Sequence, residues 1–308
     1  MRLPEERFAA VGEVELCYET FGERSGEPLL LVMGLATQML GWHEDLCRAL
    51  ADRGFFVIRY DNRDIGHSTH LKGRRPPSTA EIVTRRPRDP AYTLGDMAAD
   101  AAGLLDHLDL DSAHVTGASM GGMIAQTLAA EHPDRVRSLV SIMSSTGRAW
   151  FGRPALRAVP VLLTRAGGGR EAYVRRAERV FDLVGSPGFE RDVAHLREMA
   201  RLSYDRGVTA GGVGRQLGAI LASGDRTARL RRIRAPTLVV HGTADRLVGV
   251  SGGRATARAI PDARLMLIDG MGHDLPRGVW PRLIDGIEET AGRAASVEEK
   301  GAAASPTG

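Results

Sequence analysis

The chain is short of cysteine: only Cys17 and Cys47 occur among its 308 residues. They lie far apart and match no metal-ligand spacing, so we expect no metal site and no disulfide framework. We interpret both as small buried side chains in a reducing compartment. The sequence also lacks an apolar run long enough to span a bilayer, and its first residues lack the apolar core of a signal peptide. These absences predict a cytoplasmic protein with no membrane partner.

Lysine is scarce as well, because Lys72 and Lys300 are the only two among 41 basic residues. The remaining arginines are scattered among acidic residues and do not cluster with aromatic side chains. The net charge is only +3, although the calculated pI is 9.1. This pattern argues against nucleic acid as a partner. It implies no particular oligomeric state.

Short apolar runs alternate with stretches that favour helices along most of the chain. Such alternation predicts an α/β fold with a mostly parallel, doubly wound sheet. The alternating pattern of Phe8–Phe21 adds an antiparallel hairpin at the N-terminus. The helix predicted over Leu94–Leu108 has Asp96, Asp100 and His107 on its solvent side. The other predicted strands are Pro28–Met33, Phe55–Tyr60, the run ending at Gly117, Val136–Met143, Pro236–Val240 and Arg264–Ile268.

The alternation stops between residues 146 and 229, where no convincing strand occurs. Helical stretches over Glu171–Leu183, Glu190–Tyr204 and Gly214–Leu221 are separated by glycine-rich breaks. We predict that residues 146–229 form a helical cap inserted into a core domain of residues 1–145 and 230–291. Residues 292–308 are small, polar and charged, which predicts a disordered tail.

The sequence Gly117-Ala118-Ser119-Met120-Gly121 follows a predicted strand and opens a predicted helix. This is the pattern of a nucleophile elbow, in which a sharp turn exposes a serine above the sheet edge. The same five-residue pattern recurs around Ser251, but no full strand precedes it there. We therefore predict Ser119 as the nucleophile and interpret Ser251 as a helix-capping residue.

A serine hydroxyl needs an adjacent base, and the base needs a carboxylate to orient it. In an open α/β sheet these groups are expected just beyond the carboxyl ends of strands. His273 follows the last predicted strand through a glycine-rich loop, and Asp245 follows the strand before it. We predict these two as base and acid, with Asp269 and Asp274 as minor alternatives for the acid. His241 is interpreted as a support for its own turn.

An oxyanion hole requires two backbone donors. The amide of Met120, directly after the nucleophile, supplies one, and we favour the Leu35 amide as the other. Gly34 would permit close approach of that loop. Apolar residues near these positions are predicted to line the substrate pocket, although each could equally belong to the core. They are Met33, Gly34, Trp42, Met123, Trp150 and Phe151.

These motifs, together with Tyr60-Asp61-Asn62-Arg63-Asp64-Ile65-Gly66-His67-Ser68, resemble the α/β-hydrolase superfamily over residues 8–290. Within it, Met33-Gly34 resembles the oxyanion loop of aclacinomycin methylesterase-like carboxylesterases, where most relatives carry His-Gly. The resemblance implies a helical cap, no metal or organic cofactor, and cleavage of a small hydrophobic ester.

The predicted triad is also compatible with lactone or carbon–carbon bond hydrolysis. A non-catalytic ligand-binding protein on the same fold is the alternative from another class.

Overall fold

The computed structural model describes residues 5–148, 168–207 and 209–304. Its centre is an eight-stranded sheet with the order β1-β2-β4-β3-β5-β6-β7-β8. Strands β1 and β2 form an antiparallel hairpin, β2 pairs antiparallel with β4, and all later neighbours are parallel. The predicted mostly parallel sheet with an N-terminal hairpin is therefore confirmed. The strands are β1 Arg7–Val11, β2 Val14–Phe21, β3 Glu27–Val32, β4 Phe55–Tyr60, β5 Ala113–Ala118, β6 Val136–Ile142, β7 Thr237–Gly242 and β8 Arg264–Ile268.

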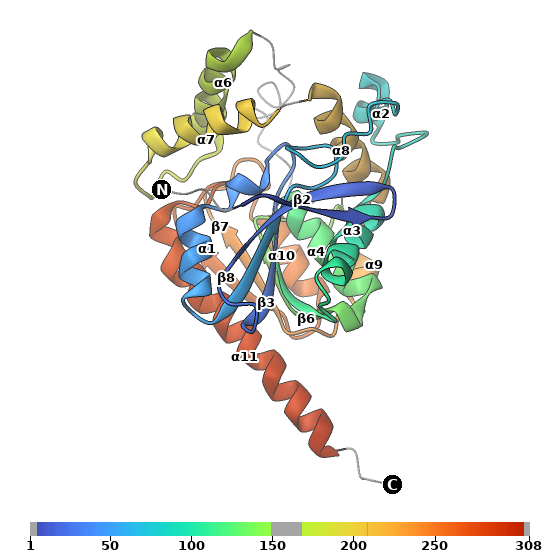
Figure 1. Cartoon of the computed structure of the whole chain (residues 1–308), viewed down its shortest axis with the longest axis vertical. Helices are drawn as coiled ribbons and strands as arrows, with labels where there is room; N and C mark the ends of the chain where they lie inside the picture. Colours follow the sequence, from blue (N-terminus) through green and yellow to red (C-terminus); the bar gives the residue numbers. More distant parts are fainter. Residues whose placement is uncertain (1–4, 149–167, 208, 305–308) are drawn as a thin grey trace.

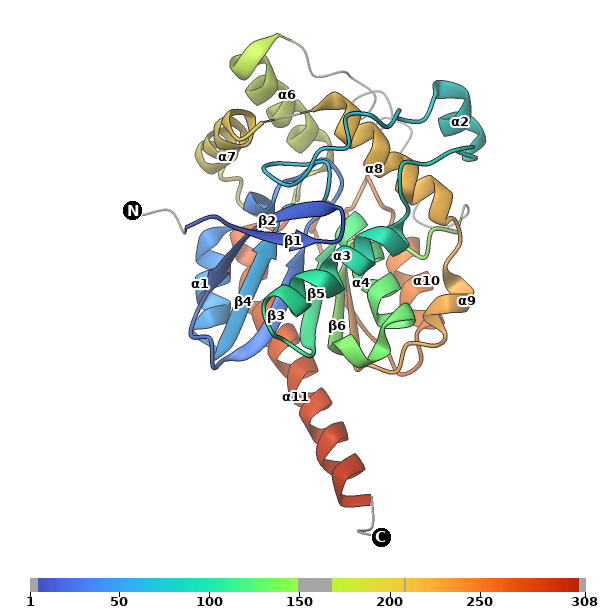
Figure 2. The ribbon, with the colours of Figure 1, turned by 45° about the vertical axis from the view of Figure 1, so that its right-hand side comes forward.

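Helices cover both faces of the sheet (Figures 1 and 2). Alternate side chains of β3 explain this: Leu30 and Val32 pack into one core, and Leu29 and Leu31 pack into the other. The first core includes residues of α3 (Leu94–His107), α4 (Met120–Glu131) and α10 (Ser251–Ala259). The second includes residues of α1 (Glu44–Ala51) and α11 (Trp280–Ala304). A strand buried on both faces reads as a continuous apolar run, as β3 does.

The chain leaves the sheet after β6 and returns at β7. Between them lie α6 (Gly169–Val184), α7 (Val193–Asp205), α8 (Ala210–Ser223) and the short α9 (Thr227–Leu230). Helices α6, α7 and α8 lie beyond one end of the sheet, away from the strand ends where α11 emerges (Figure 2). We call residues 146–229 the inserted segment. A further short helix, α2 (Thr79–Thr84), lies between β4 and α3, and it begins with a capping box at Ser78 and Glu81.

Two sequence expectations are corrected by the structure. Helix α11 continues through residues 292–304, where a disordered tail was expected, and extends away from the body (Figure 1). That stretch is rich in alanine, glutamate and other good helix formers and contains no proline. Asp100 is buried, 4% exposed, and does not lie on the solvent side of α3. Its two carboxylate oxygens accept hydrogen bonds from Nε and Nη2 of Arg63, a partner distant in sequence.

No helix in the described part of the chain is long and apolar enough to cross a membrane.

Candidate active site

Ser119 occupies the sharp turn between β5 and α4. Its φ of 57° and ψ of −118° are strained for a residue with a side chain. The neighbouring glycines are required sterically, because a Cβ at Gly117 would lie 2.2 Å from the Gly121 carbonyl oxygen. A Cβ at Gly121 would lie 2.0 Å from the Val32 carbonyl oxygen. The Ser119 amide donates to the Ile142 carbonyl over 2.9 Å and so ties the start of the turn to the end of β6.

The structure brings Ser119, His273 and Asp245 together in one hydrogen-bonded chain. His273 Nε2 lies 2.9 Å from Ser119 Oγ, and His273 Nδ1 lies 2.8 Å from Asp245 Oδ2. The Asp245 side chain is fully buried. Its second oxygen, Oδ1, accepts hydrogen bonds of 2.8 Å from the Leu247 and Val248 amides. The carboxylate is thus fixed on one side by its own turn and faces the imidazole with the other.

The other titratable groups near the site bond mainly elsewhere, although His241 Nε2 also lies 3.5 Å from Asp245 Oδ2. His241 Nε2 contacts the Val248 carbonyl over 2.7 Å, as expected for a residue that supports its turn, and burial lowers its pKa. Asp269 accepts a hydrogen bond from Thr243. Asp274 accepts one from Ser186, and burial raises its pKa. Neither alternative carboxylate replaces Asp245 beside His273.

The loop after β3 packs directly against the elbow. A Cβ at Gly34 would lie 3.1 Å from the Ser119 Cβ, so this contact depends on glycine. Among the described residues, neither the Leu35 amide nor the Met120 amide donates a hydrogen bond to another group. Two backbone donors of this kind, close to the serine, are what a developing oxyanion requires.

The predicted pocket residues differ in what the structure says of them. Met33, Gly34 and Met123 are buried next to the elbow or its loop. Trp42 is fully buried and packs in the core cluster that contains Leu46 and Leu50. Trp150 and Phe151 lie outside the described residues. The lining of a substrate pocket therefore stays a prediction.

Several hydrogen-bonding groups that hold the site in place had no local signature in the sequence. Ser144, just after β6, donates to the Ser119 carbonyl over 2.8 Å. In the inserted segment, the Val184 carbonyl accepts from the His273 amide over 2.7 Å. Ser186 Oγ accepts from the Gly272 amide over 2.8 Å. Only folding shows these contacts, because each joins segments far apart in the chain.

Glu6, Cys17 and His67 place potential metal-ligand atoms within 4.8 Å of one another. The guanidinium of Arg206 binds there instead: its Nε lies 2.9 Å from Glu6 Oε1, and its Nη2 lies 3.7 Å from Cys17 Sγ. Burial raises the pKa of Cys17 to about 12, which disfavours the thiolate that a metal needs. The positively charged Arg206 side chain therefore occupies the position between these groups that a metal ion would take.

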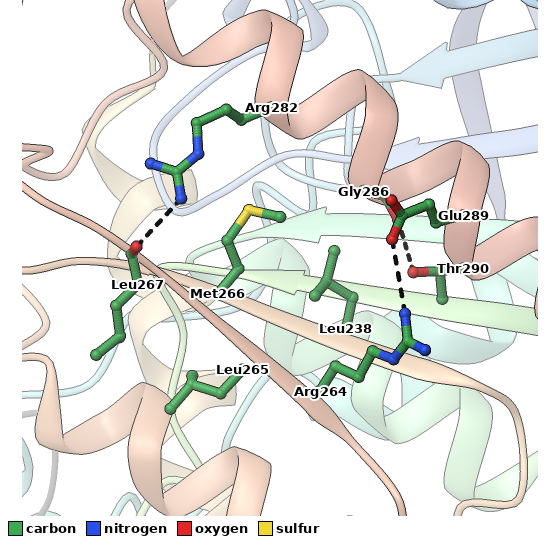
Figure 3. A pocket seen from close by; sticks show the side chains of 9 residues that line it. All are labelled: Leu238, Arg264, Leu265, Met266, Leu267, Arg282, Gly286, Glu289 and Thr290. Atoms are coloured by element: carbon green, nitrogen blue, oxygen red, sulfur yellow. Dashed lines mark hydrogen bonds and ion pairs between the residues drawn. The ribbon is translucent and has the colours of Figure 1, made fainter.

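A hollow of about 360 Å³ lies between β8 and α11 (Figure 3). Its walls include Leu265 and Met266 of the edge strand, and Arg264 and Glu289 form an ion pair across it. None of its lining residues belongs to the elbow, to the loop after β3 or to the His273 loop. It is therefore separate from the triad.

A family model described as alpha/beta hydrolase fold matches residues 27–276, so the chain belongs to the α/β-hydrolase fold family. The chain is similar to rhodomycin D methylesterase DauP of Streptomyces sp. (strain C5), with 29% identity over 91% of this chain and 96% of that protein. It is also similar to rhodomycin D methylesterase DnrP of Streptomyces peucetius, with 29% identity over 89% of this chain and 94% of that protein. A solved enol-lactonase from Burkholderia xenovorans LB400 is 26% identical over 95% of this chain and 98% of that one, with a TM-score of 0.63.

Proposed function

We propose that the chain is a serine hydrolase that cleaves a carboxylic ester, with Ser119 as nucleophile, His273 as base and Asp245 as orienting acid. The observation that carries this proposal is the uninterrupted relay from Ser119 Oγ through the imidazole to Asp245. A buried, hydrogen-bonded carboxylate keeps the ring in the tautomer that leaves Nε2 free to take a proton, and it stabilises the imidazolium.

The reaction proceeds through an acyl-enzyme. Ser119 Oγ attacks the ester carbonyl carbon while its proton passes to His273 Nε2. The negative oxygen of the tetrahedral intermediate is held by the Leu35 and Met120 amides, assisted by the positive end of α4. The C–O bond to the alcohol then breaks, and the alcohol leaves with the proton from His273. Water, deprotonated by the same imidazole, then attacks the acyl carbon. The bond from this carbon to Ser119 Oγ breaks, His273 returns the proton to Oγ, and the acid is released.

The substrate class proposed is a small, hydrophobic carboxylic ester. The names of the two methylesterase relatives favour a methyl ester. The likeness to an enol-lactonase supports a lactone as the second candidate, because a lactone is a cyclic ester that opens by the same steps. The inserted segment, residues 146–229, serves as the cap over the core of residues 1–145 and 230–291 and selects among these substrates.

Ser119→Ala is expected to lower turnover of p-nitrophenyl butyrate by at least about a thousandfold, because no other group supplies the nucleophile. Its thermal unfolding should stay close to that of the wild type. Ser251→Ala is the matched control, since Ser251 lies in the same five-residue pattern, and it should keep full activity.

A fluorophosphonate probe separates this function from a non-catalytic binding role. It should form an adduct at Ser119 in the wild type and none in Ser119→Ala. A wild-type chain that neither turns over esters nor forms this adduct would reject the hydrolase and favour a ligand-binding protein.

A further inference from the structure

We propose that Gln216, in helix α8 of the inserted segment, is a positioning residue for the oxyanion hole. The inference rests on the proposed function, in which the Leu35 amide is an oxyanion donor. Gln216 Oε1 accepts a hydrogen bond of 3.1 Å from the Ala36 amide, one residue after Leu35. Its Nε2 donates to the Arg63 carbonyl over 2.9 Å, and the side chain is fully buried.

Three polar side chains hold the loop after β3, each at a different point. Asn62 Nδ2 donates to the Met33 carbonyl over 2.9 Å at its start. Asp61 Oδ1 accepts from the Met39 amide over 2.7 Å at its end. Gln216 holds the middle, and among the described residues it is the one side chain that bonds the backbone between Gly34 and Thr37 from outside the loop.

The middle of the loop requires such a contact. Ala36 has a φ of 61°, a left-handed conformation that is strained for a residue with a Cβ. The turn's own closing bond, from the Thr37 amide to the Gly34 carbonyl, is long at 3.3 Å. Because the peptide unit is planar, fixing the Ala36 amide fixes the whole Leu35–Ala36 peptide. The preceding peptide, which carries the Leu35 amide, can then turn only about the two backbone bonds of Leu35.

Helix α8 presents Gln216 from a position that other contacts fix. The neighbouring Arg215 binds both carboxylate oxygens of Asp64, over 2.8 and 2.6 Å. The helix also packs closely on the loop after β4, which contains Asp64, because a Cβ at Gly212 would lie 2.2 Å from the Asp64 carbonyl oxygen. Replacing Gln216 should therefore leave α8 docked and remove only the two hydrogen bonds of this side chain, from the Ala36 amide and to the Arg63 carbonyl.

The test combines two variants with a transition-state analogue. Gln216→Met keeps the size of the side chain and removes both hydrogen bonds. We expect kcat for p-nitrophenyl butyrate to fall ten- to a hundredfold, less than the loss of a whole oxyanion donor, while KM changes less than threefold. The Ki of a trifluoromethyl ketone, which forms the tetrahedral adduct, should rise by the same factor. Gln216→Glu keeps an acceptor for the Ala36 amide and should lie between Gln216→Met and the wild type.

Thr209→Val is the matched control, because it removes a bond of 3.0 Å between the inserted segment and His70 that does not touch the oxyanion loop. It should leave kcat and Ki unchanged. Hydrogen–deuterium exchange of residues 33–39 gives a readout that needs no activity. Exchange should quicken most in Gln216→Met, less in Gln216→Glu, and not at all in Thr209→Val.

Unchanged exchange and unchanged Ki in both Gln216 variants would overturn this inference. A wild type without the Ser119 adduct would instead overturn the proposed function, and the exchange measurement would still decide whether Gln216 anchors the loop.

Discussion

At the scale of single residues, the turn at Ser119, the proposed nucleophile, has a strained backbone. Ser119 is held at positive φ, between glycines that cannot carry a side chain because helix and strand are in contact. Strain of this kind typically costs on the order of 1–3 kcal/mol and persists where the surrounding structure fixes it. The bond from the Ser119 amide to Ile142 and the bond from Ser144 to the Ser119 carbonyl provide that constraint.

The strain makes a prediction that separates two inactive variants. Ser119→Gly removes the β-carbon that is strained at φ 57°, whereas Ser119→Ala retains it. We expect Ser119→Gly to be more stable than Ser119→Ala by about 1 kcal/mol in urea unfolding, although glycine usually destabilises a folded chain. Neither variant should hydrolyse esters. An alanine variant that equals or exceeds the glycine variant in stability would show that the elbow is not strained.

The sequence was informative where a residue's role follows from its place after a strand. Ser119, Asp245 and His273 each follow an apolar run, and the structure brings all three together. It was uninformative where the role depends on a distant partner. Asp100 was expected in solvent because its helix alone puts it there, and only Arg63 from another loop explains its burial. Gln216 carries no signature in the sequence, because its two hydrogen-bond partners, Ala36 and Arg63, lie more than 150 residues away.

At the scale of elements, the first residue of a helix was easier to predict than its last. Helix α3 begins at Leu94 as expected, because Thr93 and Asp96 form a capping box. Helix α11 runs on through residues without a stop signal, although composition alone suggested disorder. The contact between α1 and α7 had no sequence signal at all. His43 and His195 lie with ring centroids 4.1 Å apart, where the two helices meet.

This histidine contact predicts a loss of stability in acid. Burial lowers the pKa of His43 to about 4, assisted by the neighbouring His195 and Arg277, and burial also lowers the pKa of His195. An unfolded histidine binds a proton below about pH 6.5, whereas folded His43 resists until about pH 4. The unfolded state therefore gains protons first, and stability is lost as the pH falls through this window. We expect this loss to be about 1–2 kcal/mol.

His43→Asn provides the measurement, because asparagine can still cap α1 through the Asp45 amide. In urea unfolding, the free energy of unfolding of the wild type should fall more between pH 7.5 and pH 4.5 than that of this variant. His107→Gln, at an exposed histidine of α3, should follow the wild type. Parallel pH curves for wild type and His43→Asn would contradict the prediction.

At the scale of the whole molecule, buried ion pairs join the inserted segment to the core. Arg206 binds Asp61 and Arg215 binds Asp64, and both carboxylate side chains are fully buried. Both aspartates come from the loop after β4, so this loop links the inserted helices to the sheet. Burial alone raises the pKa of Asp64, but hydrogen bonds from Arg215 and Tyr92 outweigh it and leave the pKa lowered.

The Arg215–Asp64 pair predicts how much stability the contact between the inserted segment and the core contributes. Arg215→Met leaves the Asp64 carboxylate buried with Tyr92 and the Leu71 amide as its remaining partners, which should cost about 3–5 kcal/mol at pH 8.

The cost of this substitution should also depend on pH. In the wild type, the paired Asp64 stabilises the fold above its unfolded pKa of about 3.9 and loses this contribution only in stronger acid. Unpaired, burial raises its pKa, so the penalty of Arg215→Met should shrink between pH 8 and pH 5. Adding Asp64→Asn should recover part of the loss, because the orphaned charge is removed. The exposed pair of Arg53 with Asp285 and Glu288 is the control, and Arg53→Met should cost far less stability than Arg215→Met, because water screens these charges. An equal cost for Arg215→Met and Arg53→Met in urea unfolding would mean that this ion pair does not hold the inserted segment on the core.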